Sequence, residues 1–160
     1  MFQRKNSGQQ QKNILVDLQE MCVLQYYNLK LRFPGLKICL VPDSVSRSEF
    51  EAIIDSHDVI ILSDRMLLNF SDCLHGRVNI VRNSDSFIEM TSGQFSSYLR
   101  VFPALLSEGG LVFHTNNCSD VDIDDCFKYH GGFLLHESWL EYLYEQSDQP
   151  VYRSSVWLKR

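Results

Sequence analysis

The chain has 160 residues, a length that fits one domain, and its 44% hydrophobic and 22% charged residues make an ordinary globular composition. A net charge of −5 without a basic stripe argues against general electrostatic binding to nucleic acid or anionic lipid. No apolar run approaches the roughly 18 residues that a membrane-spanning helix needs. We therefore expect neither a nucleic acid nor a membrane as partner.

The cysteines are odd in number, widely spaced, and include no Cys-x-x-Cys pair. This spacing predicts free thiols in a reducing compartment rather than a zinc or redox motif. The first twelve residues are polar, unlike a signal peptide, so we expect a cytoplasmic protein. The five cysteines are Cys22, Cys39, Cys73, Cys118 and Cys126.

In chain order, residues 1–12 predict a flexible tail, and the domain is expected to span residues 13–160. Short apolar runs predict strands, and apolar residues at helical spacing predict helices between them. Possible capping boxes at Ser46–Glu49 and Thr91–Gln94 mark two helix starts. Strands are expected over residues 13–18, 36–41, 58–63, 78–82 and 111–115. Helices are expected over residues 20–33, over residues 46–54, and from Thr91 to Gly109–Gly110, with Pro103 kinking or restarting the last of them.

The C-terminal third is less regular. Residues 116–132 are polar and acidic and predict mostly loop, whereas residues 133–144 are interpreted as a short strand followed by a helix. The alternation over residues 151–158 favours an antiparallel strand at the sheet edge. The whole pattern predicts a Rossmann-like α/β fold, with a mostly parallel sheet, helices on both faces and this antiparallel C-terminal edge strand.

In such a sheet, ligands bind at the carboxyl ends of the strands, so the residues there are the candidate site. Asp17, with Leu18 beside it, ends the first strand, and an acid at this position can hold ribose hydroxyls. The structural alternative is that Asp17 caps the helix that begins near Glu20.

The segment after the fourth strand, residues 83–90, concentrates polar side chains at the same edge. Glu89 could act as a base or bind a sugar hydroxyl, while Asn83 and Ser86 could orient a substrate. The alternative is a capped helix start in which Glu89 favours the N-terminal dipole.

His114 ends the fifth strand and could serve as a general base, with Asn116 lining the same cleft. The alternative is a structural histidine. The acids between Asp120 and Asp125 fail the calcium-loop pattern because its glycine and glutamate positions hold Asp125 and Gly131. A solvated acidic loop explains these acids better, and we expect no metal.

The order of several motifs resembles the sugar O-methyltransferases of the class I S-adenosylmethionine-dependent methyltransferases. The matching motifs cover roughly residues 13–117. They are the Asp-Leu-x-Glu stretch at 17–20, the Tyr-Tyr helix at 26–27, Phe33–Pro34, Asn-x-x-Ser-Phe-x-Glu-Met at 83–90, Tyr98 and Leu-Leu-x-x-Gly-Gly-Leu at 105–111. Gln19 stands where the family has proline, and Ile88 where it has glutamine.

The resemblance implies S-adenosylmethionine as methyl donor and a small-molecule or glycan hydroxyl as acceptor. It implies that Asp17 lies near the donor's ribose, that Asp43 or Asp64 faces the adenine, and that Asn83, Ser86 and Glu89 line the acceptor side. A base, for which Glu89 and His114 are the candidates, would remove the hydroxyl proton, and the alkoxide would attack the donor's methyl group in line.

The family's first strand and its glycine-rich turn have no counterpart before Asn13, where only twelve polar residues lie. The resemblance therefore implies an incomplete domain that lacks the central strand between the first and fourth strands found here. Two strands would then have unpaired edges, which invite pairing with a second chain. A non-catalytic Rossmann-like remnant or partner domain stays open as the alternative function, and a nicotinamide-dependent enzyme is disfavoured because it too needs a glycine-rich loop.

Overall fold

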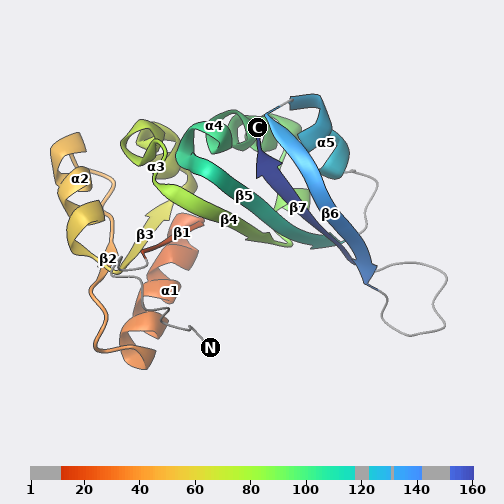
Figure 1. Ribbon diagram of the computed structural model, residues 1–160. Helices are drawn as coiled ribbons and strands as arrows, with labels where there is room; N and C mark the ends of the chain where they lie inside the picture. The colour runs from red at the N-terminus through yellow and green to blue at the C-terminus, as the bar shows by residue number, and fades with distance from the viewer. Residues whose placement is uncertain (1–11, 118–122, 131, 142–151) are drawn as a thin grey trace. The chain divides into compact units, whose positions relative to one another are not determined.

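A computed structural model describes residues 12–117, 123–130, 132–141 and 152–160 (Figure 1). The chain divides into two compact units, Met1–Cys73 and Leu74–Arg160, and each is described by itself. The predicted tail lies almost wholly outside the described residues, as do Cys118, Asp120 and Asp122. The fold class expected from the sequence is confirmed, since strands and helices alternate around parallel strand pairs in both units.

The N-terminal unit contains a three-stranded parallel sheet in the order β1-β3-β2. Its strands are β1 (Asn13–Asp17), β2 (Ile38–Leu40) and β3 (Val59–Ser63), each within a predicted apolar run. Ile60, Ile61 and Leu62 of β3 are fully buried because this strand has a partner on both sides and cover on both faces.

Helices surround this sheet. α1 (Gln19–Arg32) packs Cys22 against Ile38, Val59 and Ile61, while the alternate residues of β3 face the other side. α2 (Arg47–Ser56) begins at the predicted capping box, in which the Ser46 hydroxyl accepts from the Glu49 amide. α3 (Asp64–Asn69) and the 3₁₀ turn η1 (Ser71–Leu74) follow β3 without a connecting loop.

The C-terminal unit contains a four-stranded sheet in the order β4-β5-β7-β6. β4 (Val78–Ser84) runs parallel to β5 (Leu106–Asn117), whereas β7 (Tyr152–Lys159) is antiparallel to both β5 and β6 (Phe133–Glu141). The β4–β5 pairing aligns Asn83 with His114, so the carboxyl ends of these two strands meet at one edge.

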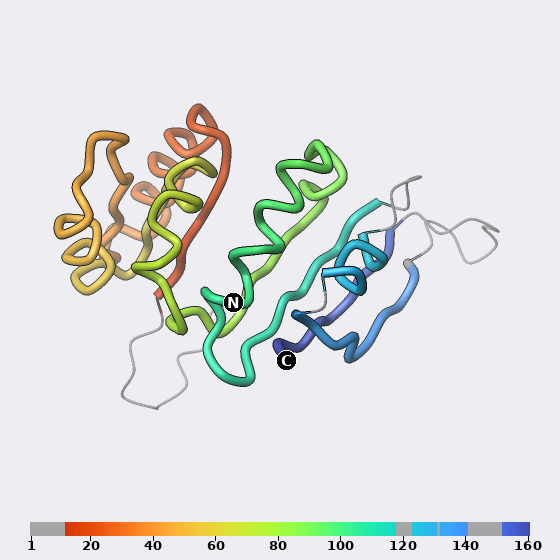
Figure 2. Tube along the Cα trace, turned by 90° about the horizontal axis from the view of Figure 1, so that it is seen from above, coloured from red at the N-terminus to blue at the C-terminus, as the bar shows by residue number. Residues whose placement is uncertain are grey.

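An aromatic core lies between this sheet and the helices α4 (Ser92–Leu105) and α5 (Ile123–His130), which cover the sheet in Figure 2. Phe127 of α5 stacks on Trp157 of β7 at a centroid distance of 5.2 Å. The 3₁₀ turn η2 (Phe87–Glu89) contributes Phe87, whose ring lies 4.8 Å from that of Phe95. Burial of these large rings stabilises this unit.

Several local predictions for this unit were wrong. β7 is antiparallel as predicted, but it lies inside the sheet between β5 and β6, and β6 forms the edge. Trp157 and the two serines before it, Ser154 and Ser155, are buried, which an edge strand would not require. The region expected to be loop contains α5, and residues 133–141 form one strand with no helix among them.

The α4–β5 junction also differs from the prediction. The helix ends at Leu105 and the strand begins at Leu106, ahead of the two glycines that were expected to end the helix. Gly109 adopts a φ of +71°, and a Cβ on Gly110 would lie 2.9 Å from the Ser107 carbonyl oxygen. The glycines therefore allow an irregularity within the strand. Pro103 lies in the last turn of a continuous helix.

The cap of α4 supports the loop that carries the candidate acceptor residues, and its contribution can be measured. Thr91→Ala removes the hydroxyl that accepts from the Gln94 amide. We expect unfolding to become easier by about 1 kcal/mol, or about 3 °C in a thermal melt. Thr91→Ser keeps the hydroxyl and should melt close to the wild type, whereas equal melts for all three proteins would contradict a capping role.

Candidate functional site

The candidate donor residues lie at the carboxyl ends of the three parallel strands of the N-terminal unit. Asp17 ends β1 and is in register with Ser63, so Asp64 follows at the neighbouring strand end. Asp43 follows β2, and its Oδ2 accepts a hydrogen bond of 3.0 Å from the side-chain amide of Gln19. Three carboxylates thus lie along one edge of the sheet, where the topology places ligands.

Asp17 does not cap the following helix, so the structural alternative for this residue is wrong. The N-cap is Leu18, whose side chain makes no capping hydrogen bond to the first turn of α1. Asp17 instead accepts a 2.8 Å hydrogen bond from the Leu18 amide and a 2.7 Å bond from Gln25 Nε2. Each carboxylate oxygen has a second lone pair, which leaves capacity for two further donors such as the hydroxyls of a ribose.

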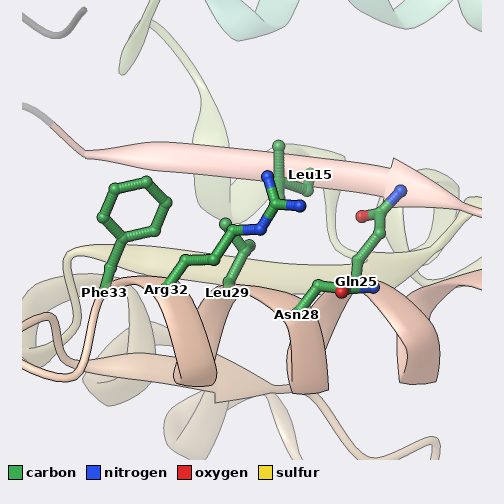
Figure 3. A pocket seen from close by; sticks show the side chains of 6 residues that line it. All are labelled: Leu15, Gln25, Asn28, Leu29, Arg32 and Phe33. Carbon is green, nitrogen blue, oxygen red and sulfur yellow. The ribbon is translucent and has the colours of Figure 1, made fainter.

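Gln25 contributes to this cluster, although the sequence assigned no role to it. Figure 3 shows its side chain projecting from α1 toward β1. Its Nε2 binds Asp17, while its Oε1 is buried and has no partner among the described residues. This unsatisfied acceptor marks a place where a hydrogen-bond donor from a ligand or from water would be stabilising.

Cys22 lies directly beneath the same strand ends. Its thiol contacts the backbone carbonyls of Asp17 and Leu62 at 3.5 and 3.4 Å. Burial raises the pKa of this thiol, and the nearby carboxylates of Asp17 and Asp64 raise it further. Cys22 is therefore a protonated packing residue at neutral pH rather than a nucleophile.

The candidate acceptor residues lie at the carboxyl ends of β4 and β5 in the C-terminal unit. Asn83 is buried and donates from Nδ2 to Ser86 Oγ, while its Oδ1 is buried without a described partner. Asn116 Oδ1 accepts from the Phe87 amide at 3.2 Å and so fixes the start of η2. Glu89 is exposed and precedes the Thr91 cap, so it is not in the first turn of α4.

The loop between β4 and η2 is constrained by Asp85, which the sequence did not single out. This residue has a φ of 61°, a conformation that is uncommon outside glycine. Its amide donates to the Thr115 carbonyl at 2.7 Å, and its Oδ1 accepts from the Asn117 amide at 2.9 Å. These bonds tie the loop to the end of β5 and hold Asn83 and Ser86 in place.

His114 is enclosed by protein. Its side chain is 1% exposed, its Nε2 lies 3.1 Å from Asp124 Oδ1, and its Nδ1 lies 3.1 Å from Asn116 Nδ2. Phe127 stacks on its ring at 5.5 Å. These contacts are those of a structural histidine, and its role as a base stays a prediction.

Asp124 lies at the centre of a buried hydrogen-bond network. The sequence predicted a solvated loop acid at this position, and that prediction was wrong. Besides His114, its carboxylate accepts hydrogen bonds from Ser155 at 3.0 Å and Trp157 at 3.2 Å. Burial by itself raises the pKa of Asp124, but the bonds from His114, Ser155 and Trp157 outweigh burial and hold this pKa below its usual value. Asp125, one residue later, is exposed and pairs with Lys128.

The predicted site residues therefore form two clusters, one in each unit. Asp17, Leu18, Asp43 and Asp64 share an edge in the N-terminal unit, and Asn83, Ser86, Asn116 and Glu89 share a loop region in the C-terminal unit. Within the described ranges, no group of three or more potential metal ligands comes together. Among the same residues, no helix is long and apolar enough to cross a membrane.

The likeness between this chain and known proteins is found in their structures. No family model matches the sequence, and no curated protein matches it. A predicted O-methyltransferase from Agrobacterium tumefaciens, protein Atu636, superimposes with a TM-score of 0.54 over 91% of this chain at 16% identity. The chain has a methyltransferase-like fold. It spans 61% of the length of that protein.

Other solved structures are more distant. A protein from Sulfolobus solfataricus assigned to the type 11 methyltransferases aligns with 93% of this chain and 85% of its own, at 16% identity and a TM-score of 0.49. The antibiotic-resistance methyltransferase Kmr aligns with 94% of this chain and 89% of its own, at 13% identity and a TM-score of 0.48. Because both of these TM-scores are below 0.5, the likeness in fold is taken from the Agrobacterium protein.

The Asp124 network can be tested by substitution. Asp124→Ala leaves the buried donors of His114, Ser155 and Trp157 without their acceptor, so we expect a loss of about 3 kcal/mol in the free energy of unfolding. Asp125→Ala changes an exposed side chain and should change this free energy by less than about 0.5 kcal/mol. Denaturant titration measures both values, and equal effects would contradict the structural role of Asp124.

The lowered pKa of Asp124 also predicts a pH dependence with a definite sign. The contribution of the Asp124 carboxylate to stability is complete above the usual aspartate pKa of about 4 and is lost as pH falls through the lowered value. Asp124→Asn lacks this ionisation. We expect the stability difference between wild type and Asp124→Asn to shrink as the pH is taken from 7 toward 3, and a constant difference would refute the assignment.

Proposed function

We propose that the chain is an S-adenosylmethionine-dependent O-methyltransferase domain whose acceptor is the hydroxyl group of a sugar or similar small molecule. The observation that carries the proposal is the row of carboxylates at the ends of β1, β2 and β3, with Asp17 held in place by Gln25. The fold and the motif over residues 83–90 support the same function.

The donor residues fit the chemistry of a nucleoside. Asp17 has lone pairs left for the two ribose hydroxyls, and Leu18 offers an apolar side chain that is 61% exposed next to it. Asp43 and Asp64 are the candidate acceptors for the adenine amino group. When bound, S-adenosylmethionine supplies a methyl group activated by its sulfonium.

The acceptor residues fit a polar hydroxyl compound. The buried, unpartnered Oδ1 of Asn83 is an acceptor for a substrate hydroxyl, and Ser86 is within hydrogen-bonding reach of Asn83. Glu89 is the exposed carboxylate of this loop and is the stronger candidate for receiving the hydroxyl proton. Asn116 orients the loop, and His114 is retained as a second candidate base. No step in this scheme calls for a metal.

We also propose a cytoplasmic location. Cys22, Cys39 and Cys73 are free thiols. Burial raises the pKa of each of them. Unpaired, protonated thiols are usual in a reducing compartment.

A non-catalytic domain is the second candidate, and one observation favours it. Among the described residues, no strand of either sheet is followed by a Gly-x-Gly turn of the kind that holds the methionine portion of the donor. A domain of this kind would keep the scaffold without binding the donor.

Donor binding separates the two candidates. At about 100 times its dissociation constant, S-adenosylhomocysteine should stabilise the folded chain by roughly 2.7 kcal/mol, a rise of several degrees in a thermal melt. Asp17→Asn should reduce this rise, because an amide replaces one of the two acceptor oxygens with a donor. Glu51→Gln, an exposed change on α2, is the matched control and should keep the full rise. A cooperative melt without any ligand-dependent rise would favour the non-catalytic domain.

The role of Glu89 can be measured separately. With radiolabelled donor and a panel of sugar hydroxyl acceptors, we expect Glu89→Gln to lower turnover by about 10²-fold or more because the proton acceptor is lost. Its donor-induced melting shift should stay unchanged. Glu108→Gln, an exposed change near the start of β5, should leave both properties at wild-type values. Full activity in Glu89→Gln would remove Glu89 from the mechanism.

A further inference from the structure

Within the N-terminal unit, the outer edge of β1 has no partner strand among the described residues. β1 pairs only with β3, and the Asn13 amide donates to the Asp58 carbonyl on that side at 2.9 Å. Because peptide groups alternate in direction along a strand, those of Ile14 and Val16 face the opposite, unpaired edge. β1 contains no proline, lysine or bulge, the features that usually protect an edge from pairing.

The helix beside this edge is apolar on two faces. The inner face packs Cys22 and Leu29 against the sheet. The outward side chains of Met21, Leu24 and Leu31 are 43%, 55% and 82% exposed. Exposed apolar side chains that gather on one face of a helix are typical of an interaction surface, so this outer face of α1 has the character of an interface.

A cavity of about 480 Å³ lies along the same edge, between α1 and β1. Figure 3 shows the side chains of α1 that line it reaching toward β1. Its floor is apolar, and Gln25 contributes the buried Oε1 without a described partner. The lining residues are Leu15, Gln25, Asn28, Leu29, Arg32 and Phe33.

We propose that a second copy of this chain occupies this edge, so that two β1 strands pair antiparallel across a two-fold axis through Leu15. Ile14 of one copy then lies opposite Val16 of the other, and each such pair can exchange two backbone hydrogen bonds. The two sheets join into one of six strands, and the two α1 helices lie side by side over it. The proposal is independent of the proposed enzymatic function.

Charge complementarity favours a second copy as the occupant. α1 carries Glu20 in its first turn and Lys30 and Arg32 in its last turn. In an antiparallel pair, the acidic end of each helix lies alongside the basic end of the other, and the helix dipoles are also opposed. A parallel pair would place like charges together. Because the contact is two-fold symmetric, every favourable contact occurs twice.

Sedimentation velocity of the full chain over a range of concentrations tests the proposal. We expect a concentration-dependent monomer–dimer equilibrium. Arg32→Glu should raise the dimer dissociation constant by about tenfold, since it removes attraction and adds repulsion at two symmetric places. The double variant Glu20→Lys with Arg32→Glu should recover most of the wild-type affinity. Lys37→Glu, a basic-to-acidic change beside β2 at the far edge of the sheet, is the matched control and should dimerise normally.

A second variant tests the strand pairing directly. Val16→Pro removes an amide that faces the free edge and leaves the ladder with β3 intact, so the variant should fold and remain monomeric. Two results would overturn the proposal. One is a wild-type chain that stays monomeric at every concentration, and the other is a dimer that responds equally to Arg32→Glu and to the double variant. If Val16→Pro does not fold, the comparison of Arg32→Glu with the double variant still tests the proposed dimer.

Discussion

The candidate donor site depends on the burial of one strand. β3 lies between β1 and β2, and its residues Ile60, Ile61 and Leu62 are fully covered. β3 is apolar on both faces, and its backbone pairs with β1 on one side and with β2 on the other in a single register each. The fixed register is what aligns Asp17 with Ser63 and so places the carboxylates of Asp17 and Asp64 at one edge. The chemistry proposed for this edge therefore follows from packing in the sheet below it.

A different constraint organises the C-terminal unit. A buried carboxylate is costly unless several donors satisfy it, and Asp124 is bonded by His114 of β5 and by Ser155 and Trp157 of β7. The network ties α5 to β5 and β7 around the aromatic core. Within this network, His114 contacts Asp124 and Asn116, while Glu89 is exposed on the loop after β4. Burial therefore separates these two candidate bases.

The sequence predicted the elements that depend on local signals. Apolar runs located all three strands of the N-terminal sheet, and both capping boxes were confirmed. It could not predict that β3 separates β1 from β2, because strand order is set by contacts distant in sequence. Nor could it place Asp124 in the core, since Ser155 and Trp157 lie about thirty residues further along the chain. An acid next to other acids is typical of a solvated loop, and only its distant partners make it a core residue. β7 was expected at an edge because the full length of β6, the strand that pairs with its other side, was not recognised from the sequence.

The central claim is that the strand ends of the N-terminal unit bind the nucleoside part of a methyl donor. The most direct measurement is a two-dimensional amide NMR titration of the ¹⁵N-labelled chain with S-adenosylhomocysteine. We expect saturable shifts of the amides of Leu18, Gln25 and Asp64, which surround the Asp17 carboxylate and the neighbouring strand end. Absence of shifts at these three amides at saturating ligand, or shifts confined to the C-terminal unit, would contradict it.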